Sequence, residues 1–160
     1  MSSNSYEARD IGVISDTHGL LREEARDRLA GCGLIIHAGD VGSLQVLGDL
    51  SSIAEVAAVR GNVDGGALAD LLPATCELMV SGLKVFVIHQ LDLMGFDPAS
   101  RGIDVVVCGH THRPASAWKG GVLYLNPGSA GPRRFGLPVS LARLRIEGGQ
   151  ALPELITLAP

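Results

Sequence analysis

The chain has 160 residues, of which 46% are hydrophobic and only 4% aromatic, and it carries a formal net charge of −4 at pH 7. This length fits a single domain spanning residues 1–160, with a core that must be built from aliphatic side chains. The negative charge argues against non-specific binding to nucleic acids, which depends on many Lys and Arg side chains that neutralise phosphates.

The sequence indicates neither a membrane protein nor an exported one. No apolar run approaches the ~20 residues that a membrane helix needs. The first ten residues, MSSNSYEARD, contain no basic segment followed by an apolar one. The three cysteines, Cys32, Cys76 and Cys108, are odd in number and widely spaced, which is typical of a reducing compartment. We therefore expect a cytoplasmic protein whose cysteines pack in the core.

The first half of the chain alternates between predicted strands and predicted helices. Apolar runs predict the strands, and the stretches between them predict helices, the second with Ser43 as its N-cap. In chain order these elements are strand 11–15, helix 20–31, strand 34–39, helix 43–50 and strand 56–61. Such alternation predicts a parallel sheet.

The second half consists mainly of predicted strands. Residues 76–89 hold two alternating runs joined at Ser81-Gly82, which predicts a hairpin, and residues 96–103 predict a helix that begins at Asp97-Pro98. Further strands are predicted at 104–109, 122–126, 138–146 and 151–158, the last two antiparallel around Glu147-Gly148-Gly149. Together these elements predict an α/β fold with two facing mixed β-sheets flanked by helices, a four-layer αββα sandwich.

Side chains that can bind metals follow five of the predicted strands directly. They are Asp16 and His18, Asp40, Asn62, His89, and finally His110 and His112. Ligands of open α/β sheets bind at the carboxyl ends of strands, so we expect these seven side chains to meet. Each short motif alone is weak evidence, but their shared position at strand ends indicates a metal site. His37 lies inside its strand, and we expect it to be structural.

The ordered motifs resemble the signature of a known family, the calcineurin-like metallophosphoesterases. The matching motifs are Asp16-x-His18, Gly39-Asp40, Gly61-Asn62-x-Asp64, the lone His89 and Gly109-His110-x-His112. The segment NPGS at 126–129, followed by Pro132-Arg133, is similar to the small stand-alone phosphodiesterase branch of that family. The resemblance extends from about residue 11 to residue 134.

The resemblance implies a centre of two divalent ions that share the Asp40 carboxylate. It implies that one ion is held by Asp16, His18, Asp40 and His112, and the other by Asp40, Asn62, His89 and His110. It also implies that Asp16, Asp40, Asn62, His89 and His110 are catalytic, with a hydroxide that bridges the ions as the nucleophile. The expected substrate is a small phosphoester, a diester more readily than a monoester. Mixed imidazole and oxygen ligands suit Mn²⁺, which we expect, or Fe, Co, Ni or Zn, better than Mg or Ca.

Two positions depart from the family pattern. His89 is followed by Gln90, Leu91 and Asp92, whereas many relatives have Gly and a further His there. Val63 follows Asn62, where many phosphatases of the superfamily carry a His that protonates the leaving group. We therefore expect metal binding to be intact and proton transfer to the leaving group to be weak.

Other functions stay open. A retromer subunit that shares this fold resembles these enzymes yet serves as a protein-interaction module, so a non-catalytic or weakly catalytic metal-binding scaffold is the alternative. That scaffold lacks part of the ligand set, whereas all seven positions are filled here. A nuclease is disfavoured by the net charge, although Arg133 and Arg134 would suit one. The sequence leaves open whether identical copies assemble into a homo-oligomer.

Overall fold

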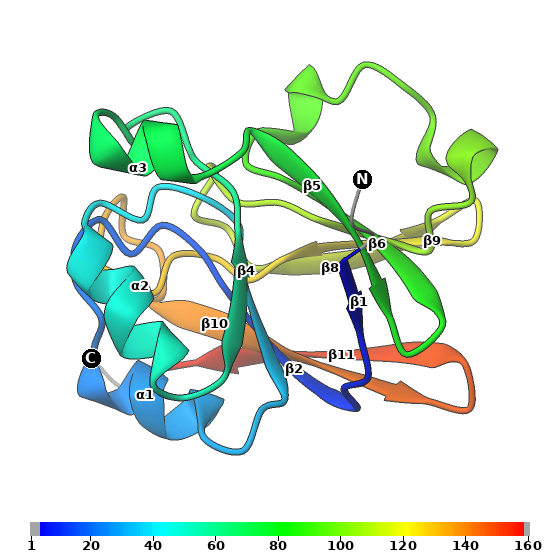
Figure 1. The fold of residues 1–160 in the computed structure, drawn as a ribbon, viewed down its shortest axis with the longest axis horizontal. Coiled ribbons are helices and arrows are strands. Elements are labelled where there is room, and N and C mark those ends of the chain that lie inside the picture. Colours follow the sequence, from blue (N-terminus) through cyan, green and yellow to red (C-terminus); the bar gives the residue numbers. More distant parts are fainter. Residues whose placement is uncertain (1–3, 159–160) are drawn as a thin grey trace.

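A computed structural model describes residues 4–158, and the predicted parallel unit forms its first sheet. Strands β2 (Asp10–Ile14), β3 (Leu34–His37) and β4 (Glu55–Ala58) run parallel and are connected by helices α1 (Glu23–Leu29) and α2 (Leu44–Ser51). The chain returns at its end as an antiparallel hairpin of β10 (Ser140–Glu147) and β11 (Gln150–Thr157). Strand β10 pairs with β2, which gives the five-stranded order β11-β10-β2-β3-β4 (Figure 1).

The remaining strands form a second, six-stranded sheet in the order β1-β5-β6-β7-β9-β8. Their bounds are β1 (Asn4–Tyr6), β5 (Thr75–Val80), β6 (Leu83–Ile88), β7 (Val105–Val107), β8 (Ala115–Lys119) and β9 (Val122–Asn126). Strands β5 and β6 are the predicted hairpin, and β6, β7 and β9 run parallel to one another. Both sheets are therefore mixed, as predicted.

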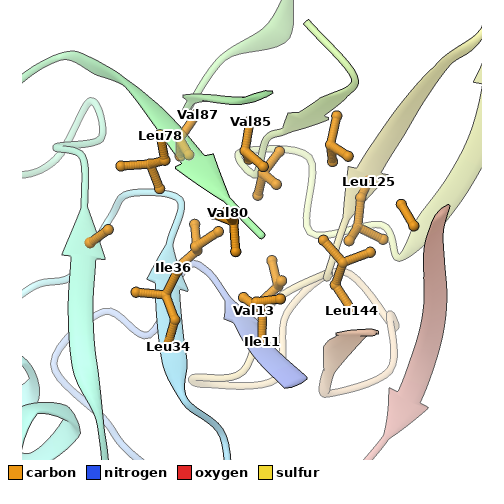
Figure 2. Packing of buried hydrophobic residues seen from close by; sticks show 14 of the residues in the cluster. Ile11, Val13, Leu34, Ile36, Leu78, Val80, Val85, Val87, Leu125 and Leu144 are labelled. Atoms are coloured by element: carbon orange, nitrogen blue, oxygen red, sulfur yellow. The ribbon is translucent and has the colours of Figure 1, made fainter. Parts of the chain in front are cut away.

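The inner faces of the two sheets enclose the main core. Figure 2 shows Ile11, Val13 and Ile36 of the five-stranded sheet gathered against Val80 and Val85 of the six-stranded sheet. All five side chains are fully buried. Burial of aliphatic side chains contributes roughly 1.5–3 kcal/mol each relative to exposure, so this layer fixes how the sheets sit on each other.

The outer faces of the two sheets are covered differently. Ala25 and Leu29 of α1 and Val46 and Leu50 of α2 pack on the five-stranded sheet. The six-stranded sheet is covered by two short 3₁₀ turns, η1 (Leu91–Leu93) and η2 (Pro98–Arg101), and by the loop between them. The two facing mixed sheets with helices outside are thus confirmed, with an outer layer of 3₁₀ turns on one side (Figure 1).

Some predicted bounds were wrong for local reasons. The helix predicted over 20–31 begins only at Glu23, because the N–H groups of Gly19 and Leu20 donate to the carbonyl oxygens of Val41 and Thr17. The helix predicted over 96–103 is the single 3₁₀ turn η2, although Asp97 does cap it by accepting a hydrogen bond from the Ala99 N–H.

Other predictions hold, and four short elements were missed. Ser43 caps α2 by accepting a hydrogen bond from the Val46 N–H at 3.4 Å. The missed elements are β1, β8, the 3₁₀ turn η1 and the five-residue helix α3 (Ala67–Leu71). Cys32 and Cys108 are buried as expected, whereas Cys76 is only partly buried against the core. Within residues 4–158, no helix has the length and apolar character to cross a membrane.

Candidate metal centre

The seven predicted ligands follow the carboxyl ends of β2, β3, β4, β6 and β7 and converge at one edge of the two sheets. Main-chain hydrogen bonds tie the loops of the five-stranded sheet together, since Asp16 N donates to Gly39 O and His18 N donates to Asp40 O, both at 3.0 Å. Two further bonds join the sheets. The His110 N–H donates to Asp16 Oδ2 at 3.1 Å, and His89 Nδ1 lies 2.7 Å from Ala38 O.

Asp16, His18 and His112 form the first group of potential ligands. His112 Nε2 lies 3.2 Å from Asp16 Oδ1, and His18 Nε2 lies 3.8 Å from the same oxygen. One ligand atom from each residue falls within 4.8 Å of the others, which is close enough to surround one ion. Asp16 and His112 are buried, so this group lies on the protein side of the centre.

Asp40, His89, Asn62 and His110 form the second group. His89 Nε2 lies 3.3 Å from Asp40 Oδ2 and 3.0 Å from Asn62 Oδ1, and His110 Nδ1 lies 3.2 Å from Asn62 Oδ1. Asn62 and His110 are exposed, so this group opens to solvent. Asp40 Oδ2 is also 3.8 Å from His18 Nε2, which places this carboxylate between the two groups, as the predicted bridging role requires.

The unpaired atoms of the centre fit a bound cation. Among residues 4–158, the buried side-chain nitrogen and oxygen atoms that lack a hydrogen-bond partner are Asp16 Oδ1, His18 Nε2 and His112 Nδ1. All three belong to predicted ligands. Leaving a buried polar atom unpaired costs about 1–3 kcal/mol, so their concentration here indicates that something else satisfies them. Carboxylate and imidazole donors are the set that divalent transition metals prefer.

The ionisation of the site agrees with this interpretation. Burial raises the pKa of Asp16, because the desolvated carboxylate lacks enough positive charge around it. Burial also opposes ionisation of Asp40, but the imidazole of His89 and the Val63 N–H hold its pKa below the ordinary value. Burial lowers the pKa of His18 and so favours the neutral form that can bind a metal. A cation beside Asp16 would supply the missing charge.

The main chain at the site is strained in a way that aims the ligands. Among residues 4–158, seven non-glycine residues have positive φ, and five of them are predicted ligands: Asp16, His18, Asp40, His110 and His112, with φ from 47° to 71°. This conformation costs energy, although Asp and His adopt it more readily than most residues. The other two are Ser81 and Phe135. The strain is therefore concentrated where five side chains turn towards one point.

The glycines of the motifs allow the close approach of neighbouring loops. A β-carbon at Gly39 would lie 2.6 Å from Nδ1 of the His89 ring. A β-carbon at Gly109 would lie 2.8 Å from Asp16 Oδ2 and would overlap the Ser15 hydroxyl. Side chains at these positions would push the ligands apart.

Two sets of supporting residues were not predicted. Asp64 turns away from the ligands, and its carboxylate accepts hydrogen bonds from the N–H groups of Val41, Gly42 and Gly61 at 2.9–3.0 Å. It therefore joins the loop after β3 to the loop after β4. The sequence shows that Asp64 belongs to the motif Gly61-Asn62-x-Asp64. It does not show that the Asp64 carboxylate accepts hydrogen bonds from Val41 and Gly42 in the other loop.

The loop that contains the NPGS segment supports the centre from the other side. Ser129 Oγ donates to Asp16 O at 2.9 Å, and Asn126 Nδ2 donates to Gly109 O at 3.0 Å. Arg22 Nε donates to Gly131 O at 3.0 Å and anchors the end of the loop. This segment therefore holds the main chain of the loops that carry the predicted ligands, rather than contacting the ligand atoms themselves.

The structure also locates the residues whose roles the sequence left open. His37 is fully buried, and its Nδ1 accepts a hydrogen bond from the Gly39 N–H while its Nε2 lies 2.9 Å from Thr17 Oγ1. The Val63 side chain is exposed. Gln90 Nε2 lies 3.4 Å from His110 Nε2, so a polar side chain does face the site at this departure from the family pattern.

Comparisons with known proteins agree with this geometry. The chain is 36% identical over 153 residues to a probable metallophosphoesterase of Methanocaldococcus jannaschii, with 86% of this chain and 76% of the relative covered. The solved structure of an archaeal phosphodiesterase superposes with a TM-score of 0.79 at 26% identity, covering 93% of this chain and 99% of that one. Vps29 of Chaetomium thermophilum superposes with a TM-score of 0.76 at 17% identity, covering 93% and 96% of the two chains, and shows the shared fold alone.

A family model decides the classification. The model of the calcineurin-like phosphoesterase superfamily domain matches residues 10–149, which include all seven predicted ligands and the supporting NPGS segment. The chain therefore belongs to the calcineurin-like phosphoesterase superfamily, as its ordered motifs predicted.

Proposed function

We propose that this protein is a metal-dependent phosphodiesterase with a centre of two divalent ions. The observation that carries the proposal is the convergence of two aspartates, four histidines and one asparagine from the ends of five strands. The similarity to relatives described as a metallophosphoesterase and a phosphodiesterase supports the same chemistry.

Each ion would have four protein ligands. Asp16, His18, Asp40 and His112 would hold the first, and Asp40, Asn62, His89 and His110 the second, with Mn²⁺ as the expected metal. When bound, such ions neutralise phosphate charge and lower the pKa of a water molecule, which supplies the nucleophile for hydrolysis. The net charge of the centre would then be positive although the chain is acidic, which suits an anionic phosphoester.

The protein's own contribution is to orient and shield these ligands. His89 Nδ1 faces the Ala38 carbonyl and donates to it, so Nε2 keeps its lone pair directed towards Asp40. Ser15 Oγ and the His110 N–H donate to Asp16 Oδ2 and leave Oδ1 free for the ion. The exposed side, at Asn62 and His110, is where a substrate phosphate would enter.

The proposal is tested by separating metal binding from turnover. The protein is stripped with a chelator and reloaded with Mn²⁺. Metal content, melting temperature and hydrolysis of bis(p-nitrophenyl) phosphate and p-nitrophenyl phosphate are then measured. We expect two ions per chain, a higher melting temperature with Mn²⁺, and faster hydrolysis of the diester. At a free Mn²⁺ concentration of 100 times the dissociation constant, each bound ion would add about 2.7 kcal/mol to the free energy of unfolding.

A protein-interaction scaffold is the alternative, because the chain shares its fold with Vps29. A scaffold that retains the ligands would bind the ions and gain stability but would hydrolyse both esters weakly or not at all. Absence of metal binding would contradict both functions.

A further inference from the structure

A cavity of about 600 Å³ opens beside the metal centre. Its inner wall is the segment from Cys108 to Thr111, which carries His110, and its outer wall is the edge strand β8. The cavity therefore begins at His110, one of the two predicted ligands on the solvent side of the centre. Pockets that bind small organic molecules have volumes of about 300–1,000 Å³, so this cavity is much larger than a phosphate group alone would fill.

Apolar groups form most of the cavity surface. Ala115 and Ala117 project from one face of β8, and Ala117 pairs across the sheet with Tyr124 of β9. Leu91 of η1 and Cys108 complete the apolar part.

The charged groups on the lining disfavour a cationic occupant. Arg113 and Lys119 line the cavity together with a single carboxylate, Asp92. Lys119 Nζ lies 5.3 Å from the centre of the Tyr124 ring, at the end of β8 away from the ligands. A positively charged group would meet more like charge than opposite charge here.

We propose that this cavity binds a bulky, neutral, apolar arm of the substrate while the metal centre holds its phosphate. The inference rests on the proposed function and narrows its substrate class to diesters with at least one large aromatic or aliphatic ester group. Inorganic phosphate and methyl esters would leave the cavity filled only with water, and so would gain nothing from its apolar walls.

Binding of phosphonates tests the inference without any turnover, because their carbon–phosphorus bond is not hydrolysed. Calorimetry of the Mn²⁺-loaded protein compares 1-naphthylmethylphosphonate with methylphosphonate. Burial of the naphthyl group in the cavity should make its dissociation constant smaller by about tenfold or more. Equal dissociation constants would overturn the inference.

Two matched variants of β8 locate the effect. Ala117→Phe fills the cavity and should reduce the ratio of the two dissociation constants to about threefold or less. Ser116→Phe adds the same ring to the opposite face of the same exposed strand and should keep the wild-type ratio. Metal content and melting temperature check that each variant is folded, and Ala117→Leu replaces Ala117→Phe if the larger ring unfolds the protein. A ratio that Ala117→Phe leaves unchanged would place the naphthyl group elsewhere and reject the cavity.

The chelator-treated protein separates failure of this inference from failure of the proposed function. If Mn²⁺ strengthens binding of both phosphonates but the ratio stays near one, the cavity assignment is wrong and the metal centre stands. If Mn²⁺ strengthens binding of neither, the proposed function is wrong, and with it the substrate class inferred from it.

Discussion

Gly61 packs against Asp40 so closely that a β-carbon at position 61 would overlap both the carboxylate and the main-chain nitrogen of Asp40. Gly61 has no positive φ, so its main-chain conformation alone would accept alanine. Glycine is therefore required at position 61 because the Asp40 carboxylate leaves no space for a side chain, and not because of the main-chain conformation. Asp40 lies between the two groups of ligands, which makes this contact a sensitive point of the centre.

Gly61→Ala should displace Asp40 and lower both metal content and hydrolysis of bis(p-nitrophenyl) phosphate by about tenfold or more. Gly65→Ala is the matched control, because nothing lies within 4 Å of a β-carbon there. Elemental analysis and rate measurements on both variants check the prediction. Full metal content in Gly61→Ala would show that the loop relaxes without moving Asp40.

The position of Asp40 also predicts unequal effects of two ligand substitutions. Asp40→Ala should lower occupancy of both metal positions, because its carboxylate faces His18 and His89 at once. His112→Ala should weaken mainly one, since His112 lies beside Asp16 in the first group. Metal-to-protein ratios after dialysis distinguish the two results. A near-complete complement of metal in Asp40→Ala would exclude the bridging role.

Asp64 should affect stability and not the chemical step. Asp64→Ala removes the acceptor of three N–H groups, from Val41, Gly42 and Gly61, and should lower the free energy of unfolding by about 3 kcal/mol. Asp70→Ala, at an exposed position of α3, should change it by less than about 0.5 kcal/mol. Urea unfolding of the metal-free proteins measures both values. A normal unfolding curve for Asp64→Ala would contradict the loop-joining role.

The convergence of the ligands could be predicted because it follows from topology. Alternating strands and helices place the carboxyl ends of parallel strands at one edge, and polar residues after apolar runs are visible in any sequence. The sequence therefore predicts that Asp16 and Asp40 lie close together, and the strands that precede them, β2 and β3, do pair in parallel. The contact between the loops of the two sheets was harder to predict from the sequence, because the hydrogen bond from His110 N to Asp16 Oδ2 links residues 94 positions apart.

The elements that the sequence did not predict lack a repeating pattern of hydrophobic residues. All five residues of β8 are exposed, so its sequence ASAWK does not alternate between buried and exposed positions. Helix α3 has only five residues and follows Gly65-Gly66, which weakens any helical pattern. Since β8 forms the outer wall of the cavity beside His110, the sequence predicts the candidate metal ligands but not the space next to them.

The protein should lose stability on acidification because of His37. Burial lowers the pKa of His37 to about 4, whereas an unfolded chain titrates near 6.5. Between these values the unfolded state binds more protons, so the free energy of unfolding falls as the pH falls. Over the whole interval the loss is about 3 kcal/mol, and above pH 6.5 this contribution no longer changes.

Metal-free wild type and His37→Gln, unfolded in urea at several pH values, isolate this contribution because Gln does not titrate. The wild type should lose more stability than the variant between pH 6.5 and 4. Nuclear magnetic resonance of the His37 ring gives a direct check, and titration of that ring above pH 6 would contradict the prediction.

Val63 should set the dependence of the rate on the leaving group. Its exposed alkyl side chain cannot donate a proton, and the carboxylate of Asp64 is held by three main-chain N–H groups. Proton donation by a positioned acid typically contributes 10²- to 10⁴-fold in rate, and its absence matters most when the departing alkoxide is a strong base. The wild type should therefore cleave aryl esters much faster than alkyl esters.

Val63→His should raise kcat/KM for alkyl esters by about tenfold or more and change kcat/KM for aryl esters little, because the exposed position accepts an imidazole without repacking. Val63→Asn is the matched control, since its amide is polar but does not transfer a proton near neutral pH. Esters of graded leaving-group pKa measure the slope for all three proteins. A flat slope in the wild type with chemistry rate-limiting would mean that another group already protonates the leaving oxygen.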